Sequence, residues 1–429
     1  ALLKGDGAVD VDAAHGSVRP DSVAKILLTS GSTSAPKGVP TTHRMMCTNQ
    51  TMIADALPFV AERPPVLVDW LPWNHVFGGS HNFNLVLANG GTLYIDDGKP
   101  VPALVGRTIE NLSMVSPTLS FNVPLGFAQL LPALERDAAL RARYFGALDM
   151  IFYAGASLPE DVWAGLARLA RAERGDVPLM TSSWGLTETA PAALIQHEPT
   201  DRPGIVGVPM TGLEVKLVPD SAAPERFEVR VRGESVFTGY LNAPDKTAAA
   251  FDDEGFFITG DAMRFVTPGA PDRGLRFDGR IAEDFKLTSG TWVRAGELRL
   301  EVLGSLGGLA QDVVVAGADR DEIGILIFPN PEALQSGGFR PEKDNGALRD
   351  AGLAEAIADR LAARFAAASG SASRVARALV LADPPDMGAG EITAKGNLNP
   401  RRVLDLRAAL VERLYDDADP ATILVKGMP

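Results

Sequence analysis

The chain has 429 residues, 46% of them hydrophobic and 22% charged, a composition typical of a globular protein with a large core. Its net charge of −13 excludes a broad nucleic-acid-binding surface, which would be basic, although a local pocket of an acidic protein can still bind phosphate. The single cysteine, Cys47, excludes an intrachain disulfide and favours a cytoplasmic location, and no run of 18 apolar residues predicts a membrane span.

The first motif along the chain is LLTSGSTSAPKG, residues 27–38, which begins in a strand-like apolar run. Its small residues supply hydroxyl and backbone N–H donors with little steric cover, and Lys37 supplies a point charge, so the loop can wrap a polyanion. A flexible Ser/Gly linker has the same composition. The motif is not a P-loop, because Lys37 precedes Gly38. The following PTTHRMMCTNQTMIADAL predicts a turn, a threonine N-cap and a helix, which favours a binding loop.

Between residue 25 and about residue 195, short apolar runs alternate with stretches of helical periodicity, of which residues 160–174 are the clearest. The predicted buried strands are VLVDWL (66–71), GTLYID (91–96), LSMVS (112–116), LDMIFYAG (148–155) and VPLMTSS (177–183). Strand–helix alternation predicts a mainly parallel α/β sheet that binds ligands at the carboxyl ends of its strands.

The sequence pattern changes near residue 204 and again near residue 280. Short strands separated by Gly and Pro predict a small β-rich, barrel-like subdomain over residues 204–280, after an α/β part over residues 1–203. A hairpin within 312–329 and Ala-rich helices from 346 to 369 predict an α+β C-terminal domain over residues 281–429. We therefore expect an α/β fold of three parts.

Seven motifs follow one another along the chain: TSGSTSAPKG, PWNHVFGG, YAGASLP, SSWGLTE, GFFITGDA, FDGRIAEDFK and ITAKGNLNPR. In this order they resemble the adenylate-forming superfamily of acyl- and aryl-CoA synthetases, luciferases and peptide-synthetase adenylation domains, over residues 25 to 405. Residues 72–100 are most similar to feruloyl-CoA synthases. The resemblance implies a large α/β domain and a mobile C-terminal domain.

The resemblance also implies a reaction in two halves. A carboxylate attacks the α-phosphate of ATP to give acyl-AMP and pyrophosphate, and the thiol of CoA then displaces AMP, with Mg²⁺ accompanying ATP. Because the carboxylate is already a nucleophile, catalysis depends on positioning and on charge stabilisation around the phosphates.

This resemblance implies roles for the residues at the motif positions. Glu188 matches the Mg²⁺ ligand, Thr187 an α-phosphate contact, His75 an aromatic gate, and Lys395 the lysine that reaches the α-phosphate and carboxylate during adenylation. The remaining matches are Thr29, Ser30, Gly31, Ser32, Thr33 and Lys37 for the β- and γ-phosphates, Gly155, Ala156, Ser157 and Trp184 for adenine and the acyl carboxylate, Asp261 and Arg280 for ribose or phosphate, and Ser289, Gly290 and Thr291 for the CoA tunnel.

Each of these residue types has a plainer interpretation. A lone glutamate in a helix is commonly a solvated charge, Trp184 can be core, His75 can be a solvated or core histidine, and Lys395 can be an exposed surface lysine. For the acyl pocket, Phe77, Asn82, Phe83, Tyr153 and Trp184 are candidate lining residues, with core packing as the alternative.

The chain departs from the family pattern at three places. Ser34 stands where a glycine is usual, and a serine held at positive φ costs about 1 kcal/mol or more. Ala282 replaces the common hinge aspartate and is followed by Glu283 and Asp284, so the hinge residue stays unassigned. Lys395 precedes Gly396, whereas the usual order is glycine then lysine.

Three functions are compatible with these motifs. The first is an AMP-forming acid:CoA ligase acting on ferulate or another aromatic acid, with ATP and CoA as co-substrates. The second is a fatty-acyl or other aryl-CoA ligase of the same superfamily. The third is a non-catalytic nucleotide-binding relative, against which the joint presence of Lys37, Glu188, Asp261, Arg280 and Lys395 argues.

The start of the chain, ALLKGDGAVDVDAAHG, has neither an initiator methionine nor a signal-peptide pattern. In the resembling family a substantial subdomain precedes the phosphate loop, so we expect the N-terminal portion of the large domain to be missing. A fragment and an unusually short relative are both compatible with this start. No nucleic-acid partner is expected, and a homodimer is left open.

Overall fold

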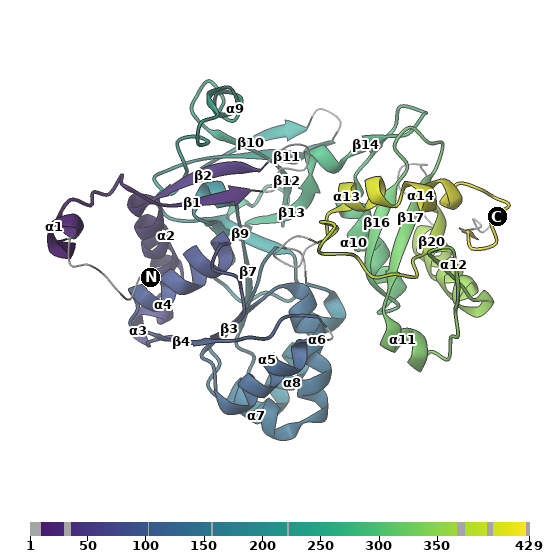
Figure 1. The fold of residues 1–429 in the computed structure, drawn as a ribbon, viewed down its shortest axis with the longest axis horizontal. Helices are drawn as coiled ribbons and strands as arrows, with labels where there is room; N and C mark the ends of the chain where they lie inside the picture. Colours follow the sequence, from purple (N-terminus) through teal and green to yellow (C-terminus); the bar gives the residue numbers. More distant parts are fainter. Residues whose placement is uncertain are drawn as a thin grey trace.

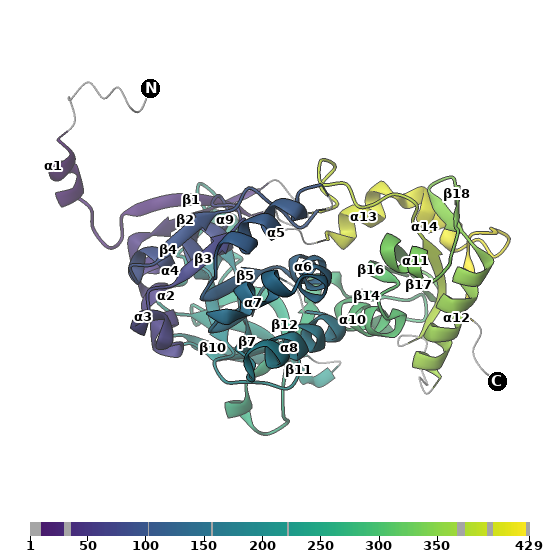
Figure 2. The same cartoon turned by 90° about the horizontal axis from the view of Figure 1, so that it is seen from below.

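The computed structural model describes residues 10–29, 36–101, 103–155, 158–220, 223–366, 374–392 and 398–425. Within them the fold is mixed α/β, as the sequence predicts. Figure 1 shows a larger unit, purple to teal, beside a smaller C-terminal unit, green to yellow, and the view from below in Figure 2 shows the same separation.

The first part of the chain forms alternating strands and helices. They are α1 (Val11–Gly16), β1 (Val23–Thr29), β2 (Lys37–Thr42), α2 (His43–Ala56), α3 (Phe59–Glu62), β3 (Val66–Asp69), the π-helix η1 (Phe77–Asn82), α4 (Phe83–Ala88), β4 (Thr92–Ile95), α5 (Val105–Met114), β5 (Leu119–Asn122), α6 (Pro124–Arg136), α7 (Ala138–Gly146), β6 (Met150–Tyr153), α8 (Glu160–Arg174), β7 (Leu179–Gly185), the 3₁₀ turn η2 (Thr187–Thr189) and β8 (Ala192–Ile195). The predicted threonine cap is confirmed: the Oγ1 of Thr42 accepts a hydrogen bond from the amide of Met45 at the start of α2.

The predicted parallel core is confirmed for β5, β6 and β7, which pair in parallel in that order. β3 and β4 form a separate parallel pair, and the amide of Val66 in β3 donates to the Oγ1 of Thr118 beside β5. The strand predicted at 112–116 is wrong. Residues 105–114 form the amphipathic helix α5 instead, with Leu112 buried, and the strand begins at Leu119. A five-residue apolar run does not separate a helix end from a strand.

Two hydrophobic cores cover the two faces of these strands. Phe121 and Phe152 belong to the core that also contains residues of α2, α4 and β7, whereas Tyr153 belongs to the core beneath α5–α8. This follows from the alternation of side chains along a strand, which sends Phe152 and Tyr153 to opposite faces. Figure 1 shows α5–α8 together on one side of the sheet.

The predicted barrel-like subdomain is not a barrel in the described part of the chain. Its elements are β9 (Ile205–Pro209), β10 (Glu214–Asp220), β11 (Ala223–Arg232), α9 (Pro244–Ala248), β12 (Phe257–Phe265), η3 (Pro271–Arg273) and β13 (Leu275–Arg280). The strands continue the core sheet in the order β10-β11-β12-β13-β9-β8-β7-β6-β5. Because β13 pairs with β9, and β9 with β8, the edge that would close a barrel is occupied.

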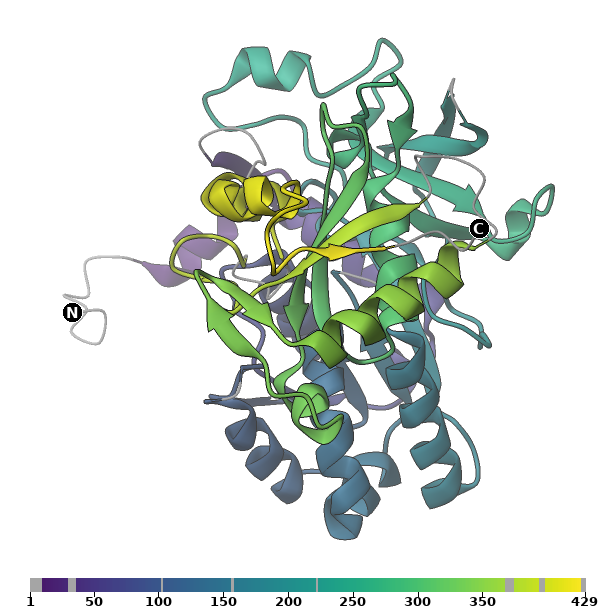
Figure 3. The ribbon, with the colours of Figure 1, turned by 90° about the vertical axis from the view of Figure 1, so that its right-hand side faces the viewer.

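The C-terminal unit is built on a four-stranded sheet of order β16-β17-β20-β21. Its elements are η4 (Ile281–Glu283), β14 (Phe285–Lys286), β15 (Trp292–Val293), α10 (Ala295–Leu306), β16 (Ala310–Ala316), β17 (Ile323–Pro329), α11 (Pro331–Ser336), β18 (Glu342–Asp344), β19 (Ala347–Arg349), α12 (Ala351–Phe365), β20 (Val375–Val380), α13 (Pro400–Leu406), α14 (Ala408–Leu414) and β21 (Ile423–Leu424). The predicted β16–β17 hairpin is confirmed. Figure 3 shows α12 on one side of this sheet and α13 and α14 on the other.

The Ala-rich stretch predicted as helices from 346 to 369 divides differently. Residues 347–349 pair with 342–344 as a short hairpin, and one helix, α12, begins only after Asp350. The Asp350 side chain accepts a hydrogen bond from the amide of Leu353 and so marks the true N-cap. In the residues that the structure describes, no helix has the length and apolar character needed to span a membrane.

Candidate active site

The ends of the phosphate loop predicted from the sequence are held together by strand pairing. Thr29, the last residue of β1, lies opposite Lys37, the first residue of β2, and the Thr29 hydroxyl donates to the Lys37 carbonyl at 3.4 Å. The loop residues Ser30, Gly31, Ser32 and Thr33 lie outside the described residues. The hairpin therefore fixes where the loop leaves and re-enters the fold.

Glu188 and Lys37 both contact a third residue, Tyr240, which the sequence analysis did not single out. The hydroxyl of Tyr240 donates to the Oε1 of Glu188 at 2.9 Å, and the Lys37 Nζ lies 4.0 Å from the centroid of the Tyr240 ring. The backbone supports this arrangement: the amide of Phe237 donates to the Glu188 carbonyl, and the amide of Leu241 donates to the Gly38 carbonyl. Loop 237–241 thus joins β2 to the turn that carries Glu188.

Burial shifts the pKa values of this group. The pKa of Lys37 is lowered, mainly because the ammonium is partly desolvated, although the nearby Glu188 carboxylate opposes that change. The pKa of Tyr240 is raised, first by burial and then by the negative charge of Glu188. The phenol therefore stays protonated at neutral pH and acts as a donor to the carboxylate. A cation and a carboxylate beside a small-residue loop suit a polyphosphate with its counter-ion.

Asp261, the predicted ribose ligand, is fixed by two neighbours. The Trp184 indole N–H donates to its Oδ2 at 2.8 Å, and the Nε of Arg280 lies 3.4 Å from its Oδ1. Asp261 and Arg280 are also opposite residues of the β12–β13 ladder. The side chains of Trp184 and Asp261 are buried, whereas that of Arg280 is half-exposed. Trp184 is part of the main core, and its indole hydrogen bond orients the Asp261 carboxylate.

We call this whole assembly the nucleotide corner. It consists of Lys37, Trp184, Glu188, Tyr240, Asp261 and Arg280. Thr187 is buried next to Glu188 in the same 3₁₀ turn. Gly155, two residues beyond the end of β6, has φ of +90°, a conformation that favours glycine. Ala156 and Ser157, which complete that predicted turn, lie outside the described residues.

His75 precedes a π-helical turn, a structure that is rare and frequent at functional sites. The imidazole Nδ1 of His75 accepts a hydrogen bond from the amide of Phe77 at 3.2 Å, so the half-buried ring is held at the start of η1. A side chain on Gly79 would come within 2.0 Å of the Trp73 carbonyl oxygen, so only glycine allows this close packing. The ammonium of Lys25 and the amide of Gln50 donate to the Gly79 and Ser80 carbonyls.

Three polar side chains form a buried chain at the end of this π-helix. The Asn82 Nδ2 donates to the Asp69 Oδ2 at 3.0 Å, and the Asn82 Oδ1 lies 2.9 Å from the His81 Nδ1. Burial raises the pKa of Asp69 to about 6 and lowers the pKa of His81 to about 4. The His81 ring lies against Phe77, Phe121 and Phe152, with centroids 5.8, 5.3 and 5.2 Å away. We call these four rings the His81 box.

The sequence analysis missed His81, although it named Phe77 and Asn82 as candidate lining residues. Phe77 lies in the His81 box, and Asn82 holds its histidine. Tyr153 instead packs against Trp163 in the other core and accepts a hydrogen bond from the Gly204 amide. The signal for His81 was the run GGSHN, in which two glycines precede three polar residues that fall on a buried helix.

Comparisons with known proteins identify the family of the chain. The profile described as AMP-binding enzyme matches residues 3–241, which is more than half of the chain. The chain belongs to the AMP-binding enzyme family.

The relatives are distant and longer than this chain. The chain is 28% identical over 335 residues to the 3-hydroxybenzoate–CoA ligase of Aromatoleum sp. (strain CIB), covering 74% of this chain and 58% of that protein. It is 24% identical over 394 residues to the probable acyl-activating enzyme 16, chloroplastic, of Arabidopsis thaliana, covering 74% and 53%. The chain thus spans about half the length of these curated relatives.

A solved structure shows the same fold. The anthranilate CoA ligase AuaEII in complex with anthranoyl-AMP superposes with a TM-score of 0.69 at 19% identity, covering 91% of this chain and 68% of that chain. At this identity the likeness concerns the fold alone.

In this AMP-binding chain, the link between the two units is anchored by buried ion pairs. The Asp284 carboxylate lies 2.8 Å from the Arg226 Nη1 and 3.1 Å from the Arg294 Nη1. Arg226 is 1% exposed and also contacts Asp278, at 3.0 Å. Ala282, at the usual hinge-aspartate position, lies in the exposed turn η4 just before this cluster.

The predicted CoA-facing residues form an exposed tip on the C-terminal unit. Ser289, Gly290 and Thr291 connect β14 to β15, and the hydroxyls of Ser289 and Thr291 lie 2.9 Å apart. Gly290 has φ of +80°. Thr288, next to this tip, donates its amide to the Arg320 carbonyl, so the tip is tied to the β16–β17 hairpin.

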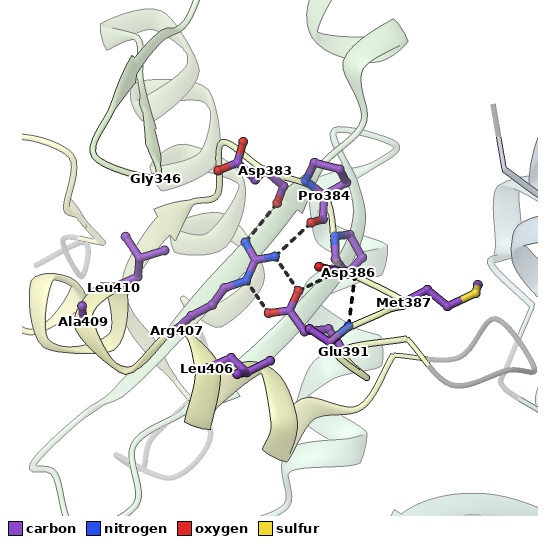
Figure 4. A pocket seen from close by; sticks show the side chains of 12 residues that line it. Gly346, Asp383, Pro384, Asp386, Met387, Glu391, Leu406, Arg407, Ala409 and Leu410 are labelled. Carbon is purple, nitrogen blue, oxygen red and sulfur yellow. Dashed lines mark hydrogen bonds and ion pairs between the residues drawn. The ribbon is translucent and has the colours of Figure 1, made fainter. Parts of the chain in front are cut away.

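Lys395 lies outside the described residues, but the structure describes both ends of its loop. Ile392 and Leu398 form an antiparallel bridge, and the Asn399 amide donates to the Glu391 carbonyl. Beside this bridge is a surface pocket of about 750 Å³, where the Arg407 guanidinium pairs with Glu391 at 2.6 Å. Figure 4 shows that Arg407 also points at the carbonyls of Asp383 and Pro384. These polar groups satisfy one another and brace the loop.

The residues of the nucleotide corner fit a magnesium ion that arrives with a nucleotide. Mg²⁺ in such sites takes one or two protein carboxylates and completes its shell with phosphate oxygens and water. In the described residues, no cluster of three His, Cys, Asp or Glu side chains can hold a metal ion by itself. The buried carboxylate of Glu188, with the hydroxyl of Thr187 in the same turn, provides the single-carboxylate donor set that this binding mode requires.

Proposed function

We propose that this chain is the catalytic part of an AMP-forming, ATP-dependent acid:CoA ligase that acts on an aromatic carboxylic acid such as ferulate or another hydroxycinnamate. The observation that carries the proposal is the meeting of Glu188, Tyr240 and Lys37 beside the two ends of the 27–38 loop. That meeting places one cation and one carboxylate where a triphosphate and its magnesium ion are expected.

The residues divide the first half-reaction among themselves. Lys37 and the loop hold the β- and γ-phosphates, Thr187 contacts the α-phosphate, and Asp261 accepts hydrogen bonds from the ribose hydroxyls. Mg²⁺ bound with ATP supplies charge neutralisation for the phosphates, and Glu188 holds it. The turn at Gly155 lets adenine and the acyl carboxylate approach the backbone. Since the carboxylate is itself the nucleophile, these contacts act by alignment and charge stabilisation.

The second half-reaction uses the C-terminal unit. Lys395 assists adenylation and leaves before CoA attacks, while the tip at 289–291 turns toward the CoA tunnel and His75 opens the path to the thiol. The fixed residues on either side of segment 393–397 support this assignment, because Ile392 and Leu398 pair and Arg407 holds Glu391 beside them.

An aromatic acid is supported by three observations. Residues 72–100 resemble feruloyl-CoA synthases, and a relative is named a 3-hydroxybenzoate–CoA ligase. Phe121 and Phe152 of the His81 box lie near the carboxyl ends of β5 and β6, where α/β folds bind ligands. We place the enzyme in the cytoplasm, because its single cysteine, Cys47, is exposed and free.

Acid-dependent ATP–pyrophosphate exchange tests the proposal. The natural full-length protein is assayed with ferulate, coumarate, benzoate and C8–C12 fatty acids. We expect the fastest exchange with ferulate- or coumarate-like acids. Faster exchange with the fatty acids than with any cinnamate would overturn the aromatic assignment and leave the ligase. No exchange with any acid, together with retained ATP binding, would favour the non-catalytic alternative.

A further inference from the structure

His81 is held in one tautomer by the side chains behind it. The carboxylate of Asp69 can only accept, so the Asn82 amide nitrogen faces it and the Asn82 oxygen faces His81. The Nδ1 of His81 must then carry the proton and donate it to that oxygen. Burial keeps the imidazole neutral at pH 7. The Nε2 of His81 is therefore a hydrogen-bond acceptor with a free lone pair.

That lone pair has no partner in the part of the chain that the structure describes. The Nε2 of His81 is buried, and the histidine as a whole is 2% exposed. Its ring is enclosed by phenylalanines, which offer no hydrogen bond. Leaving a buried acceptor unpaired costs free energy, so a buried, oriented and unpaired nitrogen indicates a donor that arrives with a ligand.

The position of the His81 box indicates which ligand brings this hydrogen-bond donor. Phe121 and Phe152 lie near the carboxyl ends of β5 and β6, and Phe152 is followed by the Gly155 turn proposed for the acyl carboxylate. Phe77 is half-buried, whereas Phe121 and Phe152 are fully buried, so Phe77 is the phenylalanine of the box that is nearest to solvent. The aromatic walls match an aryl ring.

We propose that the Nε2 of His81 accepts a hydrogen bond from a hydroxyl on the aromatic ring of the acid, and so selects hydroxylated aryl acids over their unsubstituted analogues. This inference rests on the proposed ligase function. His81 is the specificity-determining residue, while Asn82 and Asp69 are positioning residues that fix its tautomer. A site built to bind a substrate hydroxyl discriminates strongly against an analogue that lacks it, because the site's own polar group then stays unpaired.

The test compares pairs of acids that differ by one hydroxyl: 4-coumarate with cinnamate, and 3-hydroxybenzoate with benzoate. We expect the wild-type protein to favour at least one hydroxylated acid of these pairs by about tenfold or more in kcat/KM for ATP–pyrophosphate exchange. In His81→Phe the ratio should fall to near unity through loss on the hydroxylated acid alone. Asn82→Ala should lower the same ratio by a smaller factor.

Tyr144→Phe is the matched control. It also removes a buried hydrogen bond, from the Tyr144 hydroxyl to Ser120 at 2.8 Å, but on the other face of the sheet. It should leave the ratio unchanged. An equal ratio in wild type and His81→Phe, or no hydroxyl preference in wild type, would overturn the proposal for His81 while the ligase stands. Absence of exchange with every acid would remove both proposals.

A second measurement covers the case in which His81→Phe does not fold. In wild-type protein labelled with ¹⁵N-histidine, His81 is expected to give the signals of a neutral imidazole down to about pH 4, because burial lowers its pKa to about 4. Adding 4-coumarate with ATP analogue should shift its Nε2 resonance, and adding cinnamate should not. Equal responses to the two acids would contradict the proposal.

Discussion

The nucleotide corner and the His81 box use polar groups in opposite ways. In the nucleotide corner the charged groups bind one another: Glu188 accepts from Tyr240, and Asp261 is held by Trp184 and Arg280. In the His81 box, the Nε2 of His81 has no hydrogen-bond partner among the described residues and lies among aromatic rings. Under the proposed function, the triphosphate and ribose are common to every turnover and are bound by charge, whereas the acid is chosen by one acceptor in apolar surroundings.

Lys395→Ala gives the largest expected effect, which is a slower adenylation half-reaction. Loss of a charge-stabilising donor costs about 10²–10³ in rate, so adenylation should slow by at least that factor. Conversion of supplied acyl-AMP and CoA to acyl-CoA should stay near the parent rate. The one-residue offset of Lys395 amounts to about 3–4 Å of backbone, which a loop can absorb.

Separate assays of the two half-reactions measure this effect. Lys343→Ala is the matched control, because Lys343 is exposed and pairs with Asp383 on the surface; both rates should be unchanged. If both half-reactions fall equally in Lys395→Ala, or neither falls, Lys395 is not the adenylation lysine.

Glu188→Gln should produce a magnesium defect. The change preserves shape and hydrogen bonding but removes the charge that a hard cation requires. Metal affinity should fall by at least the 10–100-fold that loss of an outer-shell partner costs, so activity falls and the Mg²⁺ optimum rises. Tyr240→Phe keeps the carboxylate and removes only its hydrogen bond, so its Mg²⁺ optimum should rise less than that of Glu188→Gln. An unchanged Mg²⁺ titration in Glu188→Gln would make Glu188 structural.

The pH dependence of stability should separate Asp69 from His81. The raised pKa of Asp69, about 6, means that its contribution to stability falls as pH rises from about 4 to 6. The lowered pKa of His81, about 4, means that its contribution rises from about pH 4 to 6.5. In wild type the two oppose each other.

In a variant that lacks one of the two groups, the pH dependence of stability due to the other group should become visible. Relative to wild type, Asp69→Asn should gain about 3 kcal/mol of unfolding free energy between pH 4 and 6, and His81→Phe should lose about 3 kcal/mol over the same range. Urea unfolding at several pH values measures both slopes. Parallel slopes in the two variants and wild type would show that neither group is buried in the way the structure describes.

Trp184→Phe should give the smallest effect and should change only the binding of the nucleotide. The substitution removes the indole donor to Asp261 while keeping an aromatic ring in the core. A hydrogen bond to a charged group contributes about 1.5–3 kcal/mol, so KM for ATP should rise about tenfold or more with KM for the acid unchanged. Trp163→Phe, a buried indole in the other core, is the control. A change in the KM for the acid instead would contradict the assignment of nucleotide and acid binding to two separate regions.

The two regions also differ in how far the sequence predicts them. The nucleotide corner lies in contiguous motifs, so Lys37, Glu188, Asp261 and Arg280 could be named from the order of short segments. Tyr240 was missed, because its role depends on loop 237–241 crossing between β2 and the Glu188 turn. All the proposed ligand contacts remain predictions, and Ser30 to Thr33, Ala156, Ser157 and Lys395 also lie outside the described residues.

The His81 box could not be assembled from sequence, because its four rings come from three separated segments and depend on which face each strand presents. Tyr153 and Phe152 are adjacent in the chain and enter different cores. The same lack of pairing information explains the expected barrel: strand propensity finds β9 to β13, but only the pairing of β13 with β9 shows that they extend one sheet. The helix α5 was mistaken for a strand because its last turn is short and apolar.

The pairing of Thr29 with Lys37 has one practical consequence for protein engineering. Because β1 and β2 are paired up to Thr29 and Lys37, the residues on either side of segment 30–36 have fixed positions. A segment of equal length transplanted between these residues leaves the strand register, and with it the placement of Lys37 over Tyr240, undisturbed. Libraries of such segments would explore how the β- and γ-phosphates are bound without requiring the rest of the fold to be redesigned.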